Sequence, residues 1–69
     1  MQSLSQSQNG TYTIKWMIGL SDISEQLASY HIAEGNTIQV LHKLPDSIII
    51  GYGNRRFALG NEVADRIKV

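Results

Sequence analysis

Apolar and polar residues alternate over several short stretches of the chain. Each such stretch predicts a β-strand, because successive side chains of a strand point to opposite faces of a sheet. In chain order the stretches are residues 11–20, 37–43, 47–52, 55–59 and 67–69. Turn-forming pairs such as Pro45-Asp46 and Gly53-Asn54 separate the central ones. The pattern therefore predicts about five short strands.

The periodicity changes to that of a helix between the first two predicted strands. Ile23, Leu27 and Tyr30 recur at positions i, i+4 and i+7, which places them on one face of a short helix. Asp22 and Glu25 have the spacing of a capping box at its start. We expect a helix of about two turns that ends near Tyr30 and leans on the sheet, because so short a helix is not stable alone.

A second helical turn, at residues 61–65, precedes the last predicted strand. A strand of about three residues is stable only when it pairs with another strand, for instance to close a barrel. We therefore predict an all-β fold, a small and mostly antiparallel barrel of about five strands. Its predicted core is Trp16, Ile38, Val40, Ile48, Ile50, Phe57, Leu59, Val63 and Ile67.

Residues 1–9 are mainly Ser, Gln and Asn, and Leu4 is their only aliphatic residue beyond Met1. Such a composition buries too little apolar area to offset the entropy of ordering. We therefore predict a flexible N-terminal arm over residues 1–9, on which Leu4 alone is suited to dock, and one barrel domain over residues 10–69.

Length and composition narrow the class of protein. A chain of 69 residues makes one small domain, and a pocket of the usual ligand-binding size would consume most of its core. Cysteine is absent, which excludes disulfides and thiolate chemistry. Six basic residues balance six acidic ones, so no charge surplus favours nucleic acid or an anionic membrane. No apolar run is long enough to span a bilayer or to form a signal peptide, and we expect a cytoplasmic protein.

Candidate chemistry is sparse. His31 and His42 are the only imidazoles, they lie in separate predicted elements, and no pair has the spacing of a preformed metal site. We expect no metal site and no cofactor. The serines at positions 3, 5 and 7 lie in the predicted arm, where no base is held beside them. We therefore expect that the chain is not an enzyme.

A basic pair, Arg55-Arg56, lies beside Tyr52 and Phe57, and small barrels use such residues to bind nucleic acid. The two arginines point to opposite faces of a strand, however, and the chain has no net positive charge. We interpret the pair as a solvated hairpin tip and expect no nucleic-acid partner.

The order of these elements resembles that of the FeoA family, the ferrous iron transport protein A proteins. Residues 27–41 resemble the helix-to-strand segment of the family, residues 48–59 its central hairpin, and residues 58–69 its ending. The resemblance covers residues 10–69 and implies an SH3-like barrel. Its motifs are distributed along the chain rather than gathered in one signature.

One position departs from the family pattern, because His31 stands where the family has Gly. A positive φ at this position would cost free energy, although His tolerates it better than most residues. We favour an ordinary helix C-terminus, where His interacts with the last carbonyl groups. The alternative is that His31 projects at the rim and contacts a partner.

The resemblance also implies a function. FeoA proteins are cytoplasmic accessories of FeoB, a membrane transporter of ferrous iron with a cytoplasmic GTP-binding domain, so we expect contact with that domain. Tyr30, His31 and Ile32 are the candidate partner-binding residues; alternatively, Tyr30 and Ile32 only cover an open end of the barrel.

The alternative function is an isolated SH3-like domain of the metal-dependent-repressor type that binds a peptide or protein segment. The residues before Gly10 carry no DNA-binding region, which favours the accessory. Homo-oligomer formation is left open.

Overall fold

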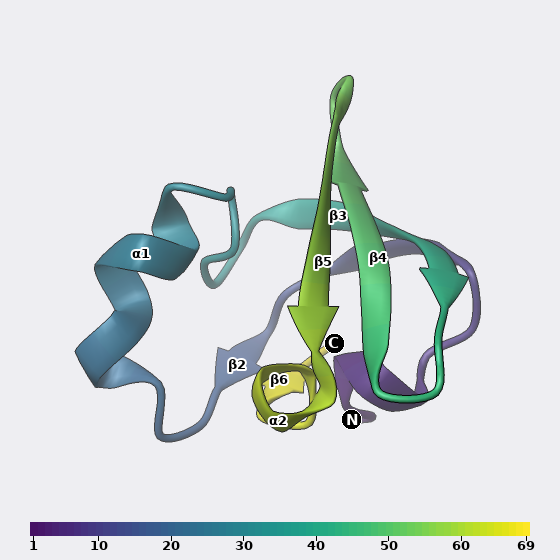
Figure 1. The fold of residues 1–69 in the computed structure, drawn as a ribbon. Coiled ribbons are helices and arrows are strands. Elements are labelled where there is room, and N and C mark those ends of the chain that lie inside the picture. Colours follow the sequence, from purple (N-terminus) through teal and green to yellow (C-terminus); the bar gives the residue numbers. More distant parts are fainter.

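The chain forms two antiparallel β-sheets around one core, as the computed structural model of residues 1–69 shows (Figure 1). The larger sheet has the strand order β1-β3-β4-β5, and the smaller one pairs β2 with β6. The strands are β1 (Gly10–Thr13), β2 (Trp16–Met17), β3 (Thr37–Lys43), β4 (Ser47–Tyr52), β5 (Arg55–Gly60) and β6 (Ile67–Lys68). The helical elements are η1 (Leu4–Gln6), η2 (Ser21–Ile23), α1 (Ser24–Ala28) and α2 (Asn61–Ala64). The predicted small all-β, SH3-like barrel is confirmed, with six strands in place of about five.

The hairpin of β4 and β5 follows the sequence pattern closely. Ile48 and Ile50 are each 1% exposed, and they lie opposite Leu59 and Phe57 of β5. The turn begins at Gly53, whose φ is 60°. Two-residue hairpin turns require a positive φ at this position, which Gly adopts without steric cost. Alternation and turn chemistry together predict this hairpin correctly.

Strand β3 carries a β-bulge at Leu41. The register passes from Val40 opposite Ile50 to His42 opposite Ile49, so Leu41 is the extra residue. Because the bulge shifts the alternation by one, His42 shares the outer face with Ile49 and is exposed. Strict alternation over residues 37–43 predicts that His42 shares a face with Val40, and the bulge makes this prediction wrong.

The first predicted strand is divided into β1 and β2, and the division exposes Trp16. The amide of Ile14 donates to the carbonyl of Asn36, whereas the amide of Lys15 donates to the carbonyl of Lys68. The chain therefore changes partner strands between these two residues, and the alternation does not continue past Ile14. Trp16 is 50% exposed, so the prediction that it anchors the core is wrong.

The first residues pack against the barrel. Leu4 is fully buried, and its 3-10 turn contacts α2 and β6. Ser3 pairs with Lys68 in an isolated β-bridge. This packing differs from the predicted flexible arm over residues 1–9, whereas the docking of Leu4 occurs as expected. One aliphatic side chain and a few backbone hydrogen bonds make these contacts, and the polar composition gives no sign of them.

The core is one cluster of 12 buried hydrophobic residues drawn from both sheets and from the helical segments. They are Leu4, Ile14, Leu20, Leu27, Ile32, Ile38, Val40, Ile48, Ile50, Leu59, Ala64 and Ile67. Phe57 and Val63 are partly buried and pack against the cluster. Trp16 is therefore the one member of the predicted core that neither belongs to the cluster nor packs against it.

Candidate functional site

Helix α1 forms an excursion between β2 and β3, and Figure 1 shows it standing to one side of both sheets. Leu27, which is 4% exposed, and the partly buried Ile23 attach it to the barrel. The predicted capping box of Asp22 and Glu25 does not form, because no side chain caps the start of either η2 or α1. Packing of a few side chains therefore holds the helix, as expected for an element this short.

The helical segment ends in a Schellman motif. The amide of Ile32 donates to the carbonyl of Leu27 and the amide of His31 donates to that of Ala28, each at 3.0 Å. These are the two hydrogen bonds of the motif, and Ile32 and Leu27 add its hydrophobic contact. His31 occupies the left-handed position with φ of 66°, and it is the only non-glycine residue with positive φ. The helical segment therefore ends at His31, as the favoured prediction has it, but the expectation of an unstrained residue there is wrong, because the position has the conformation that a glycine adopts freely.

Two aromatic contacts fasten the end of this segment to the β4–β5 hairpin. The imidazole of His31 stacks on the ring of Tyr52, with ring centroids 3.5 Å apart and an interplanar angle of 15°. The ring of Tyr30 lies 4.7 Å from that of Phe57 at an angle of 53°. Both contacts join segments that are distant in sequence, and they set the spacing between α1 and the hairpin.

An apolar groove lies between α1 and β5. Its volume is about 450 Å³, and eight of its ten lining residues are hydrophobic. The lining consists of Ile23, Gln26, Leu27, Tyr30, Ile32, Arg56, Phe57, Ala58, Leu59 and Val63. The guanidinium of Arg55 lies over the ring of Phe57 at 5.1 Å. The groove thus has apolar walls and a positively charged edge.

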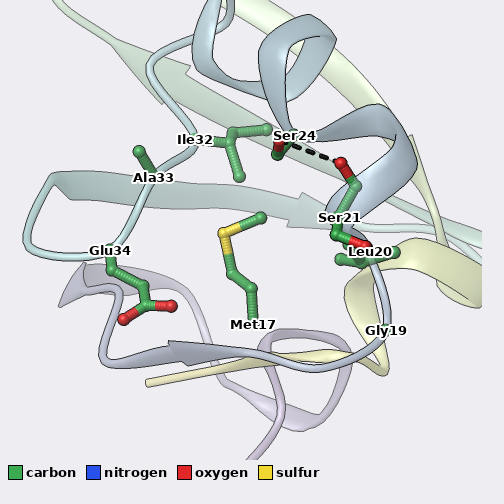
Figure 2. A pocket seen from close by; sticks show the side chains of 8 residues that line it. All are labelled: Met17, Gly19, Leu20, Ser21, Ser24, Ile32, Ala33 and Glu34. Atoms are coloured by element: carbon green, nitrogen blue, oxygen red, sulfur yellow. Dashed lines mark hydrogen bonds between the residues drawn. The ribbon is translucent and has the colours of Figure 1, made fainter.

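A second pocket, of about 360 Å³, lies on the β2 side of the excursion (Figure 2). Four of its eight lining residues are hydrophobic and three are polar, and the lining consists of Met17, Gly19, Leu20, Ser21, Ser24, Ile32, Ala33 and Glu34. Ile32 alone lines both pockets. The α1 excursion is therefore hollowed on both of its sides.

The structure separates the three candidate contact residues. Tyr30 is 36% exposed and lines the groove, and His31 is partly buried in its stack. Ile32 is 1% exposed, so it supports the surface from below rather than presenting an anchor to a partner. Sequence reasoning missed Tyr52, which holds His31. The available signal was that both aromatic residues lie beside sharp turns.

Groups that support catalysis or metal binding do not gather in this chain. No three His, Cys, Asp or Glu side chains are placed to hold a metal ion. The hydroxyl of Ser5 donates to the carboxylate of Asp65, without an imidazole to complete a catalytic arrangement. None of the helices is both long and apolar enough to cross a bilayer.

Both the sequence and the fold of this chain match those of known proteins. The family model of the FeoA domain matches residues 3–69. A crystal structure of an iron uptake regulatory protein (FeoA) superposes with a TM-score of 0.81 at 33% sequence identity, over 96% of this chain and 89% of that one. No curated protein sequence matches the chain. The family match over nearly the whole chain and the shared barrel show that this chain belongs to the FeoA family.

Proposed function

We propose that this chain is a cytoplasmic accessory protein of ferrous iron uptake, and that it acts by contact with the cytoplasmic GTP-binding part of the transporter FeoB. Membership of the FeoA family supports the link to iron uptake, because the similar solved protein is named an iron uptake regulatory protein. The observation that carries the contact role is the apolar groove between α1 and β5.

The groove has the properties of a protein-docking site. Tyr30 and Phe57 present aromatic surface at its wall, and binding energy at interfaces concentrates in a few such residues. Arg56 lines the groove and Arg55 stands over Phe57, so the edge is positively charged. We therefore propose that the docking segment of the transporter places an apolar anchor in the groove and an acidic residue beside these arginines.

The proposal includes no catalytic step and no bound cofactor. The groove and the pocket of this small barrel are open surfaces beside α1. Arg56 is the charged side chain that lines the groove, and Glu34 is the one that lines the pocket. Neither arrangement contains a nucleophile held against a base. A role as a rigid contact surface needs only the apolar and charged side chains that line the groove and the pocket.

A second candidate function uses the same groove. An SH3-like domain of the metal-dependent-repressor type would accept a peptide or protein segment against Tyr30 and Phe57. Adjacency of the gene to that of a large membrane GTPase distinguishes the accessory from this alternative.

A pull-down with the soluble cytoplasmic domain of the transporter, with and without GTP, tests the proposal. Tyr30→Ala should weaken binding by about tenfold, since truncation of an anchor residue costs more than about 1 kcal/mol. His31→Ala should weaken binding through the lost support of the hairpin. Trp16→Ala is the matched control, because Trp16 is an exposed aromatic residue that lines neither pocket.

Unchanged binding by both groove variants, or a loss confined to Trp16→Ala, would place the contact on another face. The melting temperature of each variant is measured alongside. If Tyr30→Ala and His31→Ala lose stability while the remaining folded protein binds normally, these residues are structural and the proposed surface is wrong.

A further inference from the structure

We propose that the pocket on the β2 side of α1 binds the side chain of a lysine or arginine of a partner protein. The proposal deepens the contact function above and rests on it for the source of that side chain. The lining of the pocket alone supports this chemistry, and its test does not require the transporter.

The apolar part of the pocket suits an alkyl stem. Ile32 and Leu20 are 1% and 5% exposed, and they form fixed apolar surface. Figure 2 shows the Met17 side chain between Glu34 and Ser21, with its thioether end directed toward Ile32. The unbranched, polarisable thioether adapts to neighbouring groups. Lysine and arginine bury their methylene stems on such surface while the charged head stays at the edge.

The polar part of the pocket offers hydrogen-bond acceptors from Glu34 and Ser24, and the hydroxyl of Ser21 both accepts and donates. Glu34 is the only charged residue in the lining, and its carboxylate accepts hydrogen bonds without donating any. The hydroxyl of Ser24 donates its hydrogen to the carbonyl of Ser21 at 3.0 Å, which leaves its lone pairs to accept. A group with donors and no acceptors is complementary to this set. Ammonium and guanidinium groups have that property, and both also match the negative charge of Glu34.

Charge outside the pocket fixes the orientation of the ligand. A guanidinium nitrogen of Arg66 lies 3.8 Å from the position that a Cβ on Gly19 would occupy. Positive charge therefore lies at the Gly19 end, and Glu34 supplies negative charge among the lining residues. The cationic head should meet Glu34, with the stem over Met17 and Ile32.

One partner can then occupy the groove and the β2-side pocket at the same time. Because Ile32 is the only residue common to both, a ligand in one does not displace a ligand in the other. A partner that places an apolar anchor in the groove and a basic side chain in the β2-side pocket would hold α1 from both sides. This arrangement increases the effective concentration of the second contact once the first has formed.

The test is an NMR titration of the isotope-labelled chain with N-acetyl-lysine amide, and with N-acetyl-norleucine amide as the neutral probe of similar stem. The lysine probe should shift the backbone amides of Gly19, Ala33 and Glu34 saturably, and more strongly than the norleucine probe. Glu34→Gln should weaken the lysine probe by about two- to fivefold, as expected for a solvent-exposed ion pair. Glu25→Gln, which removes an exposed carboxylate of α1 outside the pocket lining, should leave binding unchanged.

Equal shifts with the two probes would overturn the proposal, and this comparison needs no variant. Equal affinity in Glu34→Gln, or shifts centred on Tyr30 and Phe57, would also overturn it. Tighter binding of n-butylamine than of the lysine probe would assign the pocket to a free amine rather than to a side chain. Lysine binding with a failed pull-down would reject the transporter as the partner and retain the site, so the two failures are distinguishable.

Discussion

The stack of His31 on Tyr52 should appear in solution as a coupling energy between the two residues. Aromatic pairs contribute about 0.5–1.5 kcal/mol beyond the area they bury. The lower half of that range applies here, because His31 is only partly buried and Tyr52 is 44% exposed. A double-mutant cycle of His31→Ala and Tyr52→Ala should therefore give a coupling of about 0.5–1 kcal/mol.

A third variant, His31→Gly, separates the stack from the backbone strain. Alanine and glycine both remove the imidazole, but only alanine keeps a Cβ at the φ of 66°. Release from the left-handed conformation is worth about 1–2 kcal/mol. The glycine variant gives back about 0.4–1 kcal/mol of this gain, because glycine increases the conformational freedom of the unfolded chain. The glycine variant should therefore be more stable than the alanine variant by about 1 kcal/mol, or about 4–8 °C in melting temperature for a domain of this size.

Urea unfolding followed by far-UV circular dichroism measures all of these variants. The total stability of a chain of 69 residues is on the order of 3–10 kcal/mol, so none of the single substitutions should unfold it. A coupling energy near zero would refute the stack as a contact of the protein in solution. An alanine variant as stable as the glycine variant would refute the left-handed conformation of His31.

Two further predictions concern stability. Leu4→Ala should cost about 2–5 kcal/mol, because Leu4 is fully buried, whereas Gln6→Ala, at an exposed position of the same turn, should change the urea midpoint little. Equal midpoints for the two variants would mean that the N-terminal segment does not pack. Trp16→Ala should cost less than Leu4→Ala, because half of the surface of Trp16 is exposed, and an equal loss in calorimetry would restore Trp16 to the core.

The sequence predicts best where two paired strands keep one register along their length. In β4 and β5 the alternation, the turn at Gly53 and the burial all agree, because the register between these two strands is unbroken. The prediction fails at Trp16, where the chain passes from one sheet to the other. It also fails at His42, where the bulge adds one residue. Changes of partner and register depend on distant strands and leave no local pattern.

In the candidate site, too, the sequence predicts some features and misses others. The helical spacing of apolar residues that includes Leu27 correctly places α1 against the barrel. The same spacing predicts that Tyr30 lies near the rim. The burial of Ile32 follows from the Schellman motif, which turns the residue after His31 back onto the helix. The partner of His31 is a residue at a hairpin tip 21 positions further along the chain. No periodicity within either segment relates them, so only the folded arrangement reveals the contact.

The pairing of Ser3 with Lys68 also has a consequence for the order in which the barrel is completed. This bridge and the β2–β6 pair join the first part of the chain to Ile67 and Lys68, so they span the longest stretches of sequence of any strand pairing in the barrel. Until they form, Leu4 and Ile14 lack the burial that Ile67 completes. Contacts of such sequence separation carry a loop-closure cost and form slowly. The β4–β5 hairpin, whose contacts are local, should therefore assemble first, and pairing of β2 with β6 should close the barrel afterwards.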